Sequence, residues 1–284
     1  MRRRNLNSPK PADRSAGCFR TPAVAGIFYP EKKEALAELL DHLLPAGKKE
    51  NAVAAVVPHG GYFSSGSVAA AVYGRVELPP TAVIVGPNHS GLGERLSIVP
   101  DGEWITPLGR VPVDREAARA ILKAVPLLKK DLEAHQYEHS VEVQLPFLQR
   151  WGRVRSFVPI GIGGVDLETA REIGRATAEA VRRLGKKVLW IASSDLSRYE
   201  PREKVESQDR LLIEPILALD EEGLMEEAVR QSSSMCGAPA VAVVLAAAKA
   251  LGASQASLVK YEVGQITMED AVGVAVGYAG ILVK

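Results

Sequence analysis

Apolar residues along this chain gather in short runs that alternate with longer stretches of helical periodicity. Four of the runs are compact and rich in Val and Ile, as buried strands are. They occupy residues 52–57, 81–85, 155–161 and 187–192. Two further strand candidates close the chain, at residues 257–263 and 271–283.

Helical stretches separate these runs. Residues 166–184 form the longest of them, and Asp166 is placed to cap its N-terminus. The other expected helices cover residues 66–75, 202–219, 221–230 and 238–251. Continuous apolar strands joined by helices are typical of a sheet that is covered on both faces. The pattern therefore predicts an α/β fold, a single domain with a mixed, largely parallel central sheet flanked by helices on both faces.

Two parts of the chain depart from this pattern. Residues 96–113 contain several Pro and Gly among short apolar pieces, which favours an irregular β insertion. Residues 1–20 contain six Lys or Arg and one Asp, whereas the whole chain of 284 residues has a net charge of only +1. We therefore expect residues 1–19 to form a disordered basic tail and residues 20–284 to form one mildly acidic domain.

The composition, with 46% apolar and 24% charged residues, is that of a soluble globular protein. No apolar run reaches the roughly 20 residues that a membrane-spanning helix needs. The near-neutral charge gives no general attraction to nucleic acid. There is no apolar secretory core near the N-terminus, and two cysteines cannot form a disulfide scaffold. We expect a cytoplasmic protein that binds neither membranes nor nucleic acid.

Polar residues and glycines collect directly after the predicted strands. His59, His89 and Asp195 each come within a few residues of the end of a different strand. Ligands of open α/β sheets bind beyond the carboxyl ends of the strands. Because two of only five histidines lie at such positions, the sequence predicts a site at this edge, with His59 and His89 as candidate metal ligands.

A catalytic metal site usually has a third protein ligand and an open position. Asp195 would complete a set of two histidines and one carboxylate, which suits ferrous iron. Cys236 is the other candidate, because it precedes an Ala-rich helix whose N-terminus would lower the pKa of its thiol. The residues alone leave both alternatives open, and a buried, inert Cys236 also agrees with them.

A second cluster of titratable residues lies at residues 136–142, ahead of a helical stretch. His139 and Glu142 are three residues apart and can share one helix face. An imidazole oriented by a carboxylate suits general acid–base work, although acidic residues are also favoured at a helix start by the helix dipole alone. His42 and His135 lie in polar, helix-like surroundings, and we expect both at the surface.

Several other chemistries lack their motifs. There is no G-x-S-x-G nucleophile elbow, no Walker A sequence and no C-x-x-C pair. The glycines at residues 161–164 precede a helix and could meet a phosphate, but they lack the full G-x-G-x-x-G spacing.

Taken together, six motifs in order resemble the Memo family, whose prokaryotic members are often called AmmeMemoRadiSam system protein B. The motifs are RTPAVAGIFYP at 20–30, VPHGGY at 57–62, GPNH at 86–89, EHSVE at 138–142 with QLP at 144–146, SSD at 193–195, and CG at 236–237. That family is similar in fold to the class III extradiol dioxygenases of the LigB type. The resemblance therefore implies a LigB-like fold from about residue 20 to the C-terminus.

The resemblance also implies a metal site formed by two histidines and one cysteine, which map onto His59, His89 and Cys236. Asp195 would lie nearby as a catalytic or orienting group. His139 would move protons, with Glu138 as a further catalytic residue. Such a ligand set implies Fe(II), with copper and zinc as alternatives, because imidazole and thiolate suit all three metals.

Two positions depart from the family pattern. Gly60 stands where relatives usually have Ala, and Arg198 stands where they usually have His. The second change would leave His139 as the imidazole for proton transfer and would add a positive charge that favours an anionic substrate. We expect Tyr62, Asn88 and Arg198 to contact the substrate.

On this resemblance, we expect a metal-binding protein that acts as a non-haem iron-dependent, dioxygenase-like oxidoreductase on a small, anionic substrate. The alternative is a non-catalytic metal-binding recognition or accessory module, which would have radical-SAM and AMMECR-like protein partners as the systematic family name suggests. A zinc-dependent hydrolase could use the same ligands.

Overall fold

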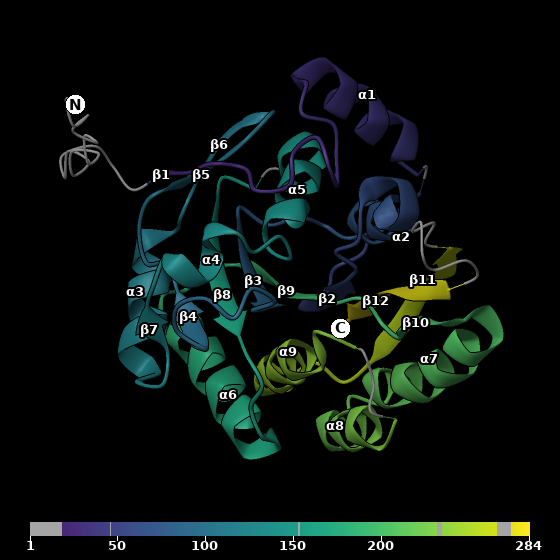
Figure 1. Ribbon diagram of the computed structural model, residues 1–284. Helices are drawn as coiled ribbons and strands as arrows, with labels where there is room; N and C mark the ends of the chain where they lie inside the picture. The colour runs from purple at the N-terminus through teal and green to yellow at the C-terminus, as the bar shows by residue number, and fades with distance from the viewer. Residues whose placement is uncertain (1–18, 46, 153, 232–234, 266–273) are drawn as a thin grey trace, which may run out of the picture.

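The structure is a computed structural model that describes residues 19–45, 47–152, 154–231, 235–265 and 274–284. A nine-stranded sheet crosses the middle of the part of the chain described, and helices pack on both of its faces (Figure 1). The predicted α/β class, with a mixed central sheet between helices, is confirmed.

Four parallel strands form the centre of the sheet. In spatial order they are β2 (Ala54–Val57), β9 (Val188–Ser193), β3 (Thr81–Pro87) and β8 (Ser156–Ile162). Every residue of β2 and β3 is buried, as expected for strands covered by helices on both faces. Because the four strands are parallel, the loops that follow them all leave from the same edge of the sheet.

Antiparallel strands extend the sheet on the β2 side. β12 (Val274–Val283) pairs with β2, and both β10 (Arg198–Pro201) and β11 (Ala256–Gln265) pair with β12. Of the strand predicted at residues 271–283, the first three residues lie outside the described residues. On the far side, β4 (Leu96–Ile98) is antiparallel to β8 and parallel to the short β7 (Lys129–Lys130).

The β insertion predicted at residues 96–113 divides between two sheets. β4 joins the main sheet, whereas β5 (Glu103–Thr106) and β6 (Gly109–Pro112) form a small sheet with β1 (Phe19–Arg20). Phe19, the last residue of the predicted tail, is thus part of a strand. Residues 1–18 of that tail lie outside the described residues.

The helices lie in two layers (Figure 1). One layer contains α1 (Lys33–Leu43), α2 (Tyr62–Arg75) and α5 (Leu145–Trp151). The other contains α3 (Arg115–Ala124), α6 (Leu167–Arg183), α7 (Arg202–Leu217), α8 (Glu221–Arg230) and α9 (Ala238–Ala250). Asp166 caps α6 as predicted, since its side chain accepts a hydrogen bond of 2.8 Å from the backbone N–H of Thr169. The helix expected at residues 66–75 begins earlier, at Tyr62.

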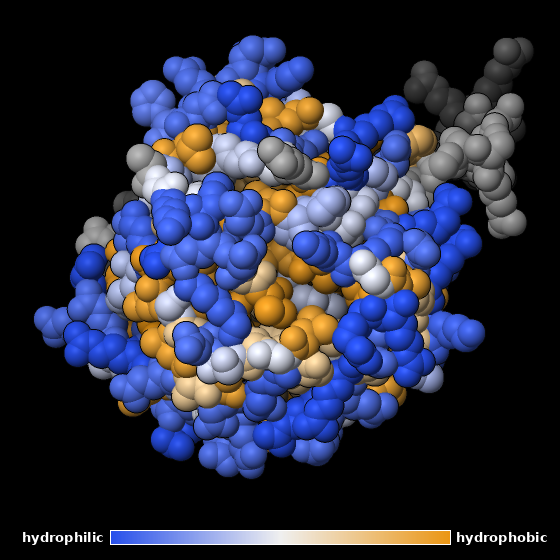
Figure 2. All heavy atoms as spheres, turned by 180° about the vertical axis from the view of Figure 1, so that it is seen from behind, coloured by the Kyte–Doolittle hydropathy of each residue, from blue (hydrophilic) through white to orange (hydrophobic). Residues whose placement is uncertain are grey.

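Most of the surface seen from behind is hydrophilic, with apolar side chains showing in smaller areas between charged ones (Figure 2). Apolar side chains are instead concentrated in a core between the sheet and its helices. α9 lies almost wholly inside this core, and its residues 240–248 are all buried. No helix of the described residues has both the length and the apolar character needed to cross a membrane.

A buried carboxylate ties the N-terminal segment to the segment ahead of α5. Glu142 Oε2 lies 2.5 Å from Arg20 Nη1, and both side chains are fully buried. Glu142 also accepts hydrogen bonds from the backbone N–H groups of Ala23 and Val24 and from the hydroxyl of Tyr29. Burial and the charge of Glu142 accordingly raise the pKa of Tyr29 far above its ordinary value.

The guanidinium of Arg20 is satisfied in the same region. It donates to the backbone carbonyls of His135 and Glu138, at 2.7 and 2.6 Å. It also lies over the ring of Trp104, 4.2 Å from the ring centre, where a cation is attracted by the face of the ring. Both charges of the Arg20–Glu142 pair therefore have several partners, as burial of an ion pair requires.

Replacing Glu142 by Gln should strongly destabilise the protein, because the Arg20 guanidinium would remain buried without its counter-charge. Removing one partner of a buried ion pair costs about 3–5 kcal/mol. Urea unfolding would measure the loss. The exposed pair of Asp41 and Arg150 provides the control, and Asp41→Asn should leave the unfolding midpoint almost unchanged. Equal effects of the two substitutions would contradict a special role for Glu142.

Candidate metal centre

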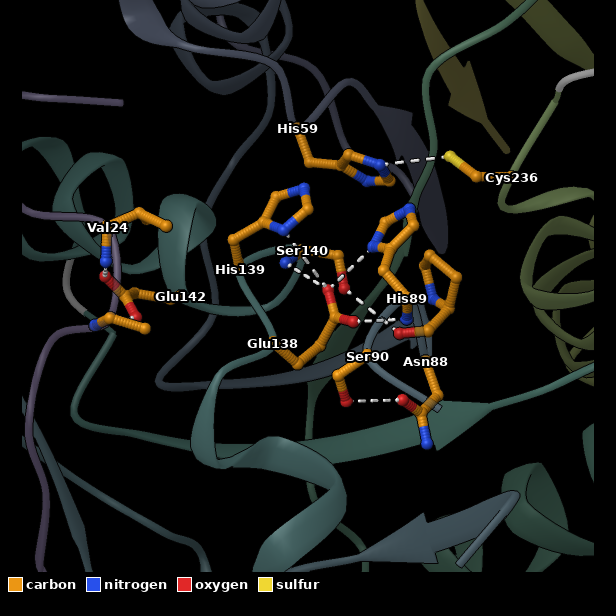
Figure 3. Close-up of polar contacts among 12 residues, drawn as sticks. Val24, His59, Asn88, His89, Ser90, Glu138, His139, Ser140, Glu142 and Cys236 are labelled. Atoms are coloured by element: carbon orange, nitrogen blue, oxygen red, sulfur yellow. Dashed lines mark hydrogen bonds and ion pairs between the residues drawn. The ribbon is translucent and has the colours of Figure 1, made fainter. Parts of the chain in front are cut away.

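Three histidines from distant parts of the sequence converge beyond the carboxyl ends of the central strands (Figure 3). His59 follows β2, His89 follows β3, and His139 lies between α4 (Glu133–Gln136) and the 3-10 helix η1 (Glu142–Gln144). One ring nitrogen of each lies within 4.8 Å of the others, so the group could hold a metal ion. The predicted strand-end placement thus brings His59 and His89 together and adds His139.

His59 is buried and is held on three sides. Its backbone N–H donates to Asp195 Oδ1 at 2.8 Å. Its ring Nδ1 lies 3.1 Å from the hydroxyl oxygen of Ser193, and its Nε2 lies 3.1 Å from the sulfur of Cys236. Asp195 also accepts from the backbone N–H of Gly60 at 3.2 Å. Asp195 therefore acts first as an anchor for the loop that carries His59.

Glu138 holds His89 in the same manner. Its Oε1 lies 3.0 Å from His89 Nδ1, and its Oε2 accepts from the His89 backbone N–H at 2.6 Å. Oε1 also accepts from the backbone N–H of Ser140 at 2.8 Å. A carboxylate bound to one ring nitrogen leaves the other nitrogen available as a ligand, which is the usual arrangement of metal-binding histidines.

His139 stacks on His89 with 4.6 Å between the ring centres, and its ring centre lies 4.8 Å from that of Phe28. Our expectation that Glu142 orients His139 is wrong, because both Glu142 oxygens are bound to the N-terminal segment. The carboxylate beside His139 is that of Glu138, with Oε1 3.7 Å from His139 Nδ1.

Cys236 lies just before α9, as the sequence predicts, and on the far side of His59 from His139 (Figure 3). Burial raises the pKa of its thiol. The charge of His59 and hydrogen bonds with His59 and His89 outweigh burial and lower that pKa to about 6. These contacts therefore favour the thiolate, which is the form that binds metals.

The same contacts separate the pKa values of the histidines. Burial lowers the pKa of His89, but hydrogen bonds to Cys236 and Glu138 prevail and raise it to about 9. Burial, together with the charge of His59, lowers the pKa of His139 to about 4. Burial opposes ionisation of Glu138, yet its bond to His89 keeps the pKa of this carboxyl well below the ordinary value.

These residues fit a divalent metal ion. Two imidazoles have their Nδ1 atoms beside Ser193 and Glu138, which turns their Nε2 atoms toward a thiolate. Imidazole and thiolate together suit iron, copper and zinc. The neutral third imidazole, His139, lies in the same space and retains a nitrogen that can accept a proton.

Two of the residues predicted to contact substrate make other contacts. Tyr62 is buried in the core, and its hydroxyl donates to the backbone carbonyl of Val143 at 2.6 Å. Asn88 holds its own loop, since its side chain donates to the carbonyl of Leu92 and accepts from Ser90 and Gly91. Asn88 is a neighbour of His89 in the chain, whereas the hydroxyl of Tyr62 is bound to Val143.

Arg198 lies close to the metal centre. Burial lowers the pKa of its guanidinium, but the charges of Cys236 and Asp195 outweigh burial and raise it. The next residue, Tyr199, has a φ of 65°, a left-handed conformation that is uncommon for an aromatic residue. Such strained backbone is typical of functional loops. Arg198 therefore adds a fixed positive charge beside the centre.

Glycine at position 60 is explained by its neighbours. A Cβ there would stand 3.0 Å from the ring of Tyr278 and 3.2 Å from the hydroxyl of Ser65. Even an alanine at this position would thus require one of these side chains to move.

Ser193, which contacts His59, and Gln144, which contacts Ser193, belong to the SSD and QLP motifs of the sequence, but the sequence assigned neither of them a role. Ser193 stands at the end of β9 and shares the strand-end position that identified the other site residues. Gln144 does not follow a strand; it lies in η1 and reaches the site only through the fold.

The two remaining histidines differ in burial. His42 is exposed, as expected. The expected surface position of His135 is wrong, because its side chain is 1% exposed and its Nε2 lies 3.1 Å from the hydroxyl of Ser97. Its Nδ1 is buried without a hydrogen-bond partner. Burial and the nearby charge of Arg20 lower the pKa of His135 to about 4.

Comparisons with known proteins identify the family of this chain. The family model described as Memo-like protein matches residues 20–282. The MEMO1 family protein MK0963 of Methanopyrus kandleri is 41% identical over 280 residues, covering 93% of this chain and 99% of that protein. A MEMO1 family protein of Aquifex aeolicus is 42% identical, covering 93% of this chain and 98% of that one. The chain belongs to the Memo family.

Two further matches complete the comparison. A MEMO1 family protein of Methanococcoides burtonii is 43% identical, covering 94% of this chain and 100% of that protein. The crystal structure of uncharacterized protein JW3007 from Escherichia coli K12 aligns with a TM-score of 0.49 and 12% identity, over 72% of this chain and 85% of that one. At this low level of likeness, the JW3007 structure supports no conclusion about this chain.

The burial of His135 predicts a loss of stability in acid. The unfolded chain binds a proton at this residue near pH 6.5, whereas the folded protein binds it only near pH 4. Between these values the unfolded state holds the extra proton, so stability present above pH 6.5 is lost as the pH falls, up to about 3 kcal/mol. His135→Gln should remove this part of the pH dependence of the free energy of unfolding. An identical pH dependence in both proteins would contradict the assignment.

Proposed function

We propose that this Memo family protein is a metal-dependent oxidoreductase in which His59, His89 and Cys236 hold Fe(II). The observation that supports this most directly is the placement of the Cys236 sulfur 3.1 Å from Nε2 of His59, which belongs to a group of three histidines that could hold a metal ion. Copper or zinc would suit the same donors. A cytoplasmic location would keep the thiol of Cys236 reduced.

An iron(II) ion with open positions would supply redox chemistry with O₂. The protein residues around it would handle protons and orientation. His139 is neutral at pH 7, since burial lowers its pKa to about 4, and it can accept a proton from a substrate group. Glu138 would hold His89 in place and stand beside His139. Asp195 would keep the His59 loop in place through two backbone N–H groups.

A small anionic substrate is favoured by Arg198. Its guanidinium is partly buried and stays positively charged beside Cys236 and Asp195. An arginine in such a position can bind a carboxylate or phosphate through paired hydrogen bonds. In this proposal the substrate would enter near Arg198 and place its reacting group close to His139.

A metal-binding recognition module with radical-SAM and AMMECR-like partners is the second candidate. It is supported by two exposed apolar side chains, Ile27 at 75% and Phe63 at 85% exposure. They flank Phe28 and Tyr62, which are joined by a backbone hydrogen bond of 2.7 Å, and Phe28 in turn contacts His139. A partner that covers these side chains would lie next to the centre.

Metal analysis of single variants would identify the third ligand. We expect Cys236→Ser to lower the affinity for Fe(II) or Zn²⁺ at least tenfold, because a thiolate ligand is lost, and His139→Ala to leave the metal content near that of the unmodified protein. The double variant His59→Ala, Cys236→Ser should hold no metal. The exposed His42→Ala is the control. Metal retained in Cys236→Ser but lost in His139→Ala would instead identify three histidine ligands.

Turnover should depend on His139 separately from metal binding. After anaerobic loading with Fe(II), exposure to O₂ with catechol-like and anionic substrates should show substrate-dependent oxygen consumption. His139→Ala should reduce that rate by about 10²–10⁴-fold while keeping the iron, since a general acid–base group contributes this much. An iron-loaded protein that turns over none of these substrates would favour the recognition module.

A further inference from the structure

A chain of buried hydrogen bonds runs behind His59, on the side away from Cys236. The hydroxyl of Tyr73 donates to Gln144 Oε1 at 2.7 Å. Gln144 Nε2 donates to the carbonyl of Pro58 at 3.0 Å and to the hydroxyl oxygen of Ser193 at 2.9 Å. Ser193 in turn lies 3.1 Å from His59 Nδ1. Tyr73, Gln144, Ser193 and His59 are all at most 1% exposed, so water does not compete for these bonds.

The donor and acceptor of each of these hydrogen bonds follow from the groups at its ends that can only accept. The carbonyl of Pro58 can only accept, so the Gln144 atom that faces it is the NH₂ group. The carbonyl of Ser140 also can only accept, and it lies 2.7 Å from the hydroxyl of Ser193, which must donate to it. With its hydrogen used and one lone pair taken by Gln144, Ser193 can only accept from His59. His59 therefore carries a proton on Nδ1, and its Nε2 is the atom left to face Cys236.

Ser140 links this chain to the second imidazole. Its carbonyl accepts from Ser193, and its N–H donates to Glu138 Oε1, which also lies beside His89 Nδ1. The hydrogen bonds that hold His59 and those that hold His89 thus meet at the backbone of Ser140. Gly86 makes this approach possible, because a side chain at this position would collide with the hydroxyl of Ser140.

We propose that Ser193 and Gln144 are positioning residues that hold the His59 ring as its Nδ1–H form, with Nε2 directed at the metal position. Gln144 orients the Ser193 hydroxyl, and Ser193 orients the imidazole. The role of the metal in this inference rests on the proposed function, whereas the proton position on His59 does not. Partners of this kind behind a ligand typically change metal affinity by 10–100-fold when they are removed.

Nuclear magnetic resonance of ¹⁵N-histidine-labelled, metal-free protein tests the proton position. We expect a ring N–H signal from His59 Nδ1 that is protected from exchange with water, identified by its loss in His59→Asn. Ser193→Ala should remove this protection, because Nδ1 loses its acceptor. Ser194→Ala is the matched control, since its hydroxyl donates only to the backbone carbonyl of Asp195 among the bonds described for it, and it should leave the signal unchanged.

Affinity for Zn²⁺, measured by competition with a chromophoric chelator, tests the consequence. Ser193→Ala should weaken binding about 10–100-fold, whereas Ser194→Ala should stay within twofold of the unmodified protein. Gln144→Met keeps the side-chain volume without the amide and should weaken binding less than Ser193→Ala. Gln149→Met, on α5 and away from the centre, is its control.

The outcomes separate the two proposals. A His59 signal that survives in Ser193→Ala with unchanged Zn²⁺ affinity would overturn the inference, as would equal losses in Ser193→Ala and Ser194→Ala. Should Ser193→Ala not fold, as judged by thermal unfolding, Gln144→Met against Gln149→Met decides by the same two measurements. A protected signal that disappears in Ser193→Ala, in a protein that binds no metal, would support the proton position and contradict the proposed function.

Discussion

The candidate metal centre depends on how one buried carboxylate, Glu142, finds its hydrogen-bond partners. A fully buried charge has to find its partners inside the protein, and all the partners of Glu142 come from residues 20–29. This requirement holds the N-terminal segment against the segment that carries Glu138 and His139. As a result, Phe28 contacts the ring of His139. The position of the third imidazole is thus coupled to a charge that takes no part in the site.

The sheet provides the other half of the centre. His59, His89 and Asp195 follow neighbouring parallel strands, so the strand register fixes the distances between their loops. The loops are then joined by side chains rather than by further secondary structure. Asp195 binds the loop of His59, and Glu138 binds the loop of His89. A rigid sheet and a few charged hydrogen bonds are enough to bring the imidazoles together.

The nitrogen of His59 that faces the centre is determined by hydrogen bonds on the opposite side of its ring. Ser193 and Gln144 have no spare proton to donate to Nδ1, which the other form would require. A buried polar network of this kind is favourable only when each member is satisfied. Proximity of the histidines alone does not select which nitrogen of His59 faces the centre. The hydrogen-bond network does.

Much of the fold and part of the site could be predicted from the sequence, because those features depend on neighbours along the chain. Apolar runs identified the buried strands, and Asp166 was recognised as a cap from its place at a helix start. His59 and His89 were found because strand ends of a parallel sheet lie at one edge. The position of Cys236 before α9 followed in the same way.

Only the tertiary structure decided which distant groups meet. Glu142 pairs with Arg20, 122 residues away, instead of the nearby His139. His135 is buried because strands and an aromatic ring close over it, although its own segment is polar. Gln144 reaches Ser193, 49 residues further along the chain. The sequence determined which residues could serve as ligands. Their partners were decided by strand order and by the need to satisfy every buried charge, which local patterns do not contain.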